Sequence, residues 1–187
     1  MKARRVLVAG AGGLGSVFGG FLRRAGHDVT LLGRPAHLEA IRRGGLRIEG
    51  IFGEAEVSGF GLATSGRETG GGFDLVIVAV KSYDTVAIAR EVAGTLSETG
   101  SVLTVQNGLV HLEALAEVFE RDRLLAAPVL IGAELPAPGR VRVTVYAKPV
   151  KIGARWGTGA SAELWSEILN EAGIPAEPTD RLLGFLW

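Results

Sequence analysis

Short apolar runs rich in β-branched residues alternate along the chain with longer amphipathic stretches. A strand buried on both faces reads as a continuous apolar run, and LVIVAV at residues 75–80 has this character. The amphipathic stretches carry apolar residues at helical spacing, so each can pack one face on a sheet. This alternation predicts parallel strands joined by crossover helices. The expected strands are residues 6–9, 29–32, 75–80, 102–105 and 124–130, and the expected helices are residues 14–25, 85–96 and 111–119.

The later part of the chain shows a different pattern. After Pro138-Gly139, residues 141–153 (VRVTVYAKPVKIG) alternate apolar and polar side chains, which predicts antiparallel strands added at the edge of the sheet. A helix is expected over residues 161–172, a small strand pair over residues 46–57 and a glycine-rich loop over residues 64–72. Together the patterns predict an α/β fold with a Rossmann-type, mostly parallel sheet, helices on both faces and antiparallel edge strands.

The final residues predict the beginning of one more helix. Thr179 or Asp180 can cap it, and the sequence ends on the apolar residues 185–187 (FLW). Two helical turns are marginal in water, so these side chains need something to cover them. We therefore expect residues 1–175 to form one domain, and residues 176–187 to begin a helix that links it to a further helical domain.

Composition narrows the classes of function. The chain has 187 residues, of which 47% are hydrophobic and 21% charged, as in an ordinary globular protein. Its formal net charge is zero, which argues against nucleic acid or an anionic membrane as partner. It has no cysteine, and His27, His37 and His111 form no ligand spacing, so neither a disulfide nor a metal site is expected. No apolar stretch is long enough to cross a bilayer, and a cytoplasmic location is the default expectation.

A glycine-rich motif follows the first expected strand directly and opens the first expected helix. It consists of Gly10, Ala11, Gly12, Gly13, Leu14 and Gly15. In this context GxGxxG predicts a dinucleotide-binding turn: Gly10 permits the tight turn, Gly12 lets a pyrophosphate approach the backbone, and Gly15 lets the helix lie close to the strand. The amides and the dipole at the helix N-terminus favour the phosphates. The alternative is a glycine-rich turn without a ligand.

The end of the second expected strand distinguishes between the two dinucleotides. An NAD-binding domain places an acid about 20 residues beyond the glycine turn, where it bonds the ribose hydroxyls. Here that place reads Leu32-Gly33-Arg34, with no acid to repel a 2′-phosphate. Arg34 offers a planar fork of donors to such a phosphate, which favours NADP as the cofactor. The alternative is that Arg34 is a solvated loop residue.

Two polar residues follow the third and fourth expected strands. Lys81 comes directly after residues 75–80, and Asn107 comes shortly after residues 102–105. Because open α/β sheets bind ligands at the carboxyl ends of their strands, both are candidates for the reactive end of the site. The alternatives are a surface cation at Lys81 and a simple turn at Asn107-Gly108.

Several motifs in this order resemble those of the ketopantoate reductases, or 2-dehydropantoate 2-reductases. They are GAGGLG with the following AGHDVTLLGR, then AVKSYD, VQNGL and IGAELPAPGRV, and together they span almost the whole chain. The resemblance implies reduction of 2-dehydropantoate to pantoate by NADPH, on the route to pantothenate and coenzyme A. It also implies that Lys81 lies beside the nicotinamide, that Asn107 contacts cofactor and substrate, and that the backbone of Ala133 lies against the cofactor.

The resemblance carries expectations beyond these residues. The family protonates the developing alkoxide through a lysine on the first helix that links its two domains, and LLGFLW at residues 182–187 resembles the approach to that motif. We therefore expect the lysine just beyond Trp187, a keto acid as the substrate, an inactive cofactor domain when alone, and dimerisation as in the family. A related reductase of another keto acid, and a stand-alone NADP-binding or redox-sensing module, are the alternatives.

Overall fold

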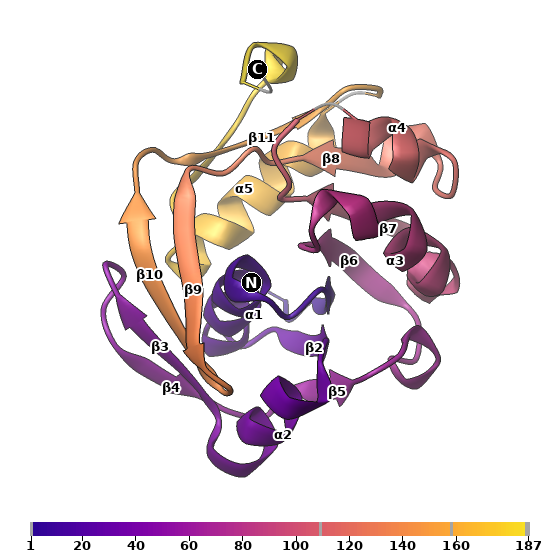
Figure 1. The fold of residues 1–187 in the computed structure, drawn as a ribbon. Coiled ribbons are helices and arrows are strands. Elements are labelled where there is room, and N and C mark those ends of the chain that lie inside the picture. The colour runs from indigo at the N-terminus through magenta and orange to yellow at the C-terminus, as the bar shows by residue number, and fades with distance from the viewer. Residues whose placement is uncertain (1, 109, 158, 186–187) are drawn as a thin grey trace.

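A computed structural model describes residues 2–108, 110–157 and 159–185 of the chain (Figure 1). Its main sheet has eight strands, all paired in parallel except β11 with β8. The predicted Rossmann-type, mostly parallel sheet is therefore confirmed. In spatial order the strands are β12 (Ala176–Pro178), β11 (Val150–Ala154), β8 (Leu124–Ala126), β7 (Leu96–Thr104), β6 (Phe73–Val78), β1 (Arg5–Ala9), β2 (Asp28–Leu32) and β5 (Gly61–Ala63).

Helices cover both faces of this sheet and create two separate cores (Figure 1). Val6 and Val8 of β1 belong to the core beneath α1 (Gly13–Arg24) and α5 (Ala160–Ala172). Leu7 and Ala9 belong to the opposite core, beneath α3 (Thr85–Val92) and α4 (Val110–Ala116). Successive side chains of a strand point to opposite faces, so a strand between two cores is apolar at every position.

A second, four-stranded sheet lies against the other side of α1 (Figure 1). Its strands, in order, are β4 (Ala55–Val57), β3 (Leu46–Gly50), β10 (Arg140–Tyr146) and β9 (Ile131–Ala137). The strand pair expected over residues 46–57 is confirmed as β3 and β4. Helix α1 lies between the two sheets, and a Cβ placed on Gly20 would lie 2.6 Å from Ile48 Cδ1 of β3.

The alternating segment 141–153 divides between the two sheets, which corrects the expectation that all of it joins the edge of the main sheet. β10 pairs antiparallel with β9 and parallel with β3, whereas β11 pairs antiparallel with β8. Alternation reports only that one face is buried: Val141 and Val143 are buried while Arg140 and Arg142 are exposed. It does not report which sheet supplies the partner strand.

Several expected boundaries also move. The helix expected to reach residue 96 ends at Val92, and β7 already begins at Leu96 with the polar residues of LSETGSVLT. The strand expected over residues 124–130 ends at Ala126, and α4 ends at Ala116 rather than at residue 119. Helix α2 (Pro35–Gly44) was not expected, although Pro35 at its first turn is a helix-start signal.

The chain end adds a strand that was not expected. Ala176–Pro178 forms β12 and pairs in parallel with β11, so these residues belong to the main sheet. A 3₁₀ helix follows at Leu182–Phe185, and Arg181 N donates to Thr179 Oγ1 at 3.1 Å. Leu186 and Trp187 lie outside the described residues. The division between residues 1–175 and 176–187 stays a prediction.

Candidate functional site

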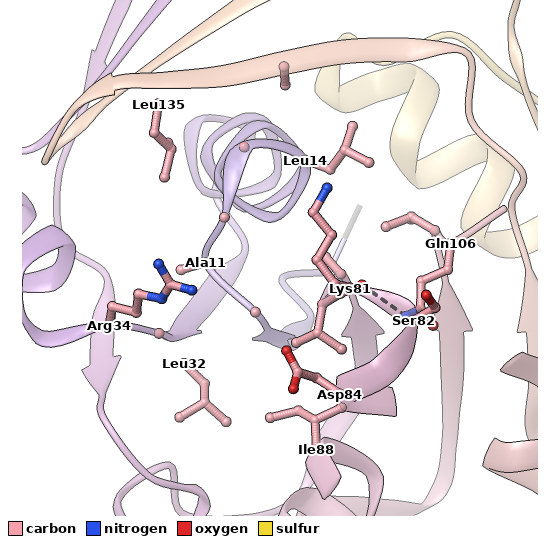
Figure 2. Close-up of a pocket in the computed structure, with 18 of the residues that line it drawn as sticks. Ala11, Leu14, Leu32, Arg34, Lys81, Ser82, Asp84, Ile88, Gln106 and Leu135 are labelled. Atoms are coloured by element: carbon pink, nitrogen blue, oxygen red, sulfur yellow. Dashed lines mark hydrogen bonds between the residues drawn. The ribbon is translucent and has the colours of Figure 1, made fainter. Parts of the chain in front are cut away.

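A cavity of about 750 Å³ lies at the carboxyl ends of the central parallel strands (Figure 2). Figure 2 shows Ala11 and Arg34 on one side of it and Lys81, Ser82 and Gln106 on the other. Of the ten predicted site residues, Gly15 alone is not among those lining the cavity, within the part of the chain that the structure describes. The predicted residues that line the cavity are Gly10, Ala11, Gly12, Gly13, Leu14, Arg34, Lys81, Asn107 and Ala133.

The glycine turn is fastened to the neighbouring strands. The amides of Gly10 and Ala11 both donate to Leu32 O, at 3.0 and 2.9 Å. Gly10 has a φ of 113°, and a Cβ on it would lie 2.7 Å from Val80 Cγ1. A Cβ on Gly15 would overlap Gly10 O. Both positions therefore require glycine for the fold itself.

Gly12 and Gly13 differ in what requires them to be glycine. A Cβ on Gly13 would lie 2.5 Å from Ala133 O, so the close passage of β9 over the start of α1 excludes any side chain there. A Cβ on Gly12 would meet no atom of the described residues within 4 Å, and its φ of −83° suits any residue. Folding therefore does not require glycine at position 12, and the space beside it belongs to the cavity.

The start of α1 presents backbone donors to this space. The first intrahelical hydrogen bond runs from Ser16 N to Gly12 O at 2.8 Å. The amides of Gly13, Leu14 and Gly15 precede that bond and so lack an i−4 carbonyl inside the helix. Amides and dipole at such an end form a region of positive potential suited to an anion.

Arg34 lies between the end of β2 and the start of α2. It is exposed, it is the N-cap residue of α2, and its guanidinium extends over the cavity near Ala11 (Figure 2). No ion pair with another of the described residues occupies it. The guanidinium can therefore bind an anion in the cavity without breaking an existing pair.

Lys81 and Asn107 line the same cavity from adjacent strands. Lys81 is exposed, and its side chain extends towards Leu14 at the start of α1 (Figure 2). Asn107 Oδ1 accepts a hydrogen bond from Val129 N at 3.1 Å, which leaves the amide hydrogens as donors. Its backbone carbonyl contacts His111 Nε2 at 2.9 Å, and Gly108 has a φ of 103°. Asn107 thus opens a turn and also exposes a polar side chain.

Two buried polar residues at the cavity were not predicted as site residues, although Gln106 lies within the motif VQNGL. Gln106, at the end of β7, hydrogen-bonds Val80 O and Thr85 Oγ1. His37 lies 3.0 Å from Ser16 Oγ through Nε2, and its Nδ1 accepts from Gly139 N at 3.0 Å. Burial lowers the pKa of His37 below its ordinary value of 6.5, so the neutral ring is favoured.

The described residues hold no cluster of three or more histidine, cysteine, aspartate or glutamate side chains arranged for a metal ion. Among them there is also no helix long and apolar enough to span a membrane.

The strand order and the cavity at the carboxyl ends of the parallel strands are those of a Rossmann-type domain. The sequence profile of the family described as "Ketopantoate reductase PanE/ApbA" matches residues 6–173. The chain belongs to this family.

Individual relatives agree with this assignment. The chain is 34% identical over 190 residues to the 2-dehydropantoate 2-reductase of Archaeoglobus fulgidus, covering 100% of the chain and 60% of the relative. A crystal structure of a PanE/ApbA family ketopantoate reductase from Ralstonia eutropha JMP134 superposes with a TM-score of 0.87 at 34% identity, covering 98% of this chain and 59% of that one. A D-mandelate dehydrogenase solved with NADH and anilino(oxo)acetate shares the fold, with a TM-score of 0.86 and 22% identity over 97% of this chain and 59% of its own.

Proposed function

We propose that this chain binds NADPH in the cavity and forms the cofactor-binding part of a reductase of 2-dehydropantoate. The observation that carries the proposal is the open space beside Gly12, directly in front of the first-turn amides of α1. Folding would allow a side chain at this position, yet the residue is glycine. Such a glycine fits the close approach of a pyrophosphate to the protein backbone. The likeness to named reductases supports the substrate.

The residues at the end of β2 favour NADP over NAD. Arg34 occupies the place of the usual acid, is exposed at the cavity, and can offer two parallel N–H donors to a 2′-phosphate. A carboxylate at this position would repel that phosphate, and none is present at residues 32–34.

The remaining residues then lie at the reacting end. With the pyrophosphate at Gly12 and the 2′-phosphate at Arg34, the nicotinamide lies between Lys81, Asn107 and the backbone of Ala133. When bound, it supplies the hydride that reduces the keto carbon. Lys81 contributes positive charge near the developing alkoxide, and the Asn107 amide donates to the substrate's polar groups. We infer that the proton comes from a lysine beyond residue 187, and the likeness of residues 182–187 to the approach to the family's lysine motif supports this.

A titration tests the proposal. We expect the fluorescence of the 187-residue chain to change saturably as NADPH is added. The Kd for NADPH should be lower than the Kd for NADH. Equal affinities would contradict the assignment of NADP, and binding of neither cofactor would contradict the proposed site.

A further inference from the structure

A buried glutamine ties together the carboxyl ends of β6 and β7. Gln106 is only 8% exposed, and its amide nitrogen donates to Val80 O and to Thr85 Oγ1, both at 2.8 Å. Its amide oxygen accepts from Thr104 Oγ1 at 2.9 Å. The amide therefore has one satisfied orientation, because exchanging nitrogen and oxygen would set an acceptor against Val80 O.

This side chain extends the connection between the strands past their regular pairing. The register of β6 and β7 ends with Val78 opposite Thr104, and Val105 N donates to Val78 O at 3.1 Å. Gln106 then reaches Val80, two residues beyond the end of β6. The segments that leave the two strands are thus held at a fixed separation where the backbone ladder stops.

The network holds the residues before and after Lys81 in the chain. Val80, which precedes Lys81, accepts from Gln106. Ser82, which follows Lys81, accepts through its carbonyl from Thr85 Oγ1 at 2.9 Å, and Thr85 is itself bonded to Gln106. Asn107 is the residue next to Gln106 in the chain. One buried amide therefore fixes the backbone around both candidate residues of the reacting end.

We propose that Gln106 is a positioning residue that sets the spacing of Lys81 and Asn107 at the nicotinamide end of the cavity. The inference rests on the proposed function and concerns one end of the ligand only. The glycine turn packs against Val80 but donates its hydrogen bonds to Leu32 O, and Arg34, which holds the opposite end with it, is the N-cap residue of α2. Loss of the Gln106 amide should therefore affect contacts to the nicotinamide and leave contacts to the phosphates unchanged.

The test compares two ligands on the 187-residue chain. NADPH reaches both ends of the cavity, whereas 2′-phospho-ADP-ribose lacks the nicotinamide. Gln106→Met keeps the length of the side chain but removes its hydrogen bonds. The loss of these buried bonds should raise the Kd of NADPH roughly tenfold. The Kd of 2′-phospho-ADP-ribose should stay within about twofold of that of the wild type. Isothermal titration calorimetry measures both values.

A second pair of variants keeps the test decisive if Gln106→Met does not fold. Thr85→Val removes the link to Ser82 and should weaken NADPH selectively, whereas Thr85→Ser keeps the hydroxyl and should bind as the wild type does. Thr95→Val is the matched control, because Thr95 Oγ1 makes a buried hydrogen bond to Val92 O at 2.8 Å at the far end of α3. It should lower stability without changing the ratio of the two Kd values.

The outcomes separate the two proposals. A wild-type chain that binds both ligands, with Gln106→Met weakening both equally or neither, would overturn the positioning role and leave cofactor binding standing. A wild-type chain that binds neither ligand would overturn the proposed function and the inference with it.

Discussion

Arg34 is the residue on which the choice of cofactor depends. Charge-assisted hydrogen bonds to a phosphate contribute about 1.5 to 3 kcal/mol, so Arg34→Ala should weaken NADPH roughly tenfold to a hundredfold and leave NADH nearly unchanged. Arg42→Ala within α2 is the matched control, since it removes the same charge from a residue paired with Glu39. Fluorescence titration measures the affinities of the wild type and both variants for the two cofactors, and equal losses for both cofactors in Arg34→Ala would show that Arg34 does not contact the 2′-phosphate.

Gly12 and Gly15 separate binding from folding. A Cβ on Gly12 would meet no other described residue within 4 Å, so Gly12→Val should abolish binding of both cofactors while the chain without ligand stays folded. Gly15→Ala forces a Cβ against Gly10 O and should destabilise the fold by about 1 to 3 kcal/mol, the usual cost of overpacking. Thermal unfolding and NADPH titration of both variants check this, and normal NADPH binding by Gly12→Val would remove the phosphate turn from the proposed site.

Among the helices and strands, the sequence predicts those whose residue pattern fits a single type of element. β1, β2, β6 and α1 appear near their expected bounds, because continuous apolar runs and a glycine turn between strand and helix specify these elements. β12 and the start of β7 were missed, since a three-residue strand and the polar segment LSETGS carry no such pattern.

The site follows the same division. The predicted residues apart from Gly15 gather around one cavity because a parallel sheet brings the ends of its strands together. Gln106 and His37 could not be predicted, because their roles depend on partners far away in the sequence, such as Thr85 and Gly139. A single buried polar side chain acquires meaning only once its partners are known.

His37 of α2 contacts Ser16 of α1 and Gly139 between β9 and β10, and should make the association of these segments sensitive to acid. Neutral His37 accepts from Gly139 N, and a protonated ring cannot do so. Burial lowers the pKa of His37, and also that of His27, below 6.5 in the folded chain. As the pH falls, these histidines are therefore protonated in the unfolded chain before they are protonated in the folded chain. The free energy of unfolding should therefore be highest above about pH 6.5 and fall as the pH drops below it.

Urea denaturation between pH 7.5 and 5 measures this dependence, and replacing His27 and His37 together by glutamine should flatten it. The Arg140 guanidinium holds the pKa of Glu49 below 4.5, so the stabilisation by Glu49 is lost mainly below about pH 5. A wild-type slope retained in the double variant would show that other groups are responsible.

For the whole molecule, the chain spans 60% of the length of the Archaeoglobus reductase that it matches. We expect the 187-residue chain to bind NADPH but not to reduce 2-dehydropantoate measurably. The proton donor that we propose lies outside these 187 residues, and general acid catalysis contributes about 10² to 10⁴-fold. Loss of NADPH absorbance with 2-dehydropantoate tests this, and ready turnover would make Lys81 the leading candidate for the proton donor.

We propose that the cavity holds NADPH in one defined direction. A crystal structure of the chain with NADPH tests it most directly. We expect the pyrophosphate against Gly12 and the first-turn amides of α1, the 2′-phosphate beside Arg34, and the nicotinamide between Lys81 and Asn107. A cofactor bound outside the cavity, or lying with its nicotinamide at Arg34, would contradict the claim.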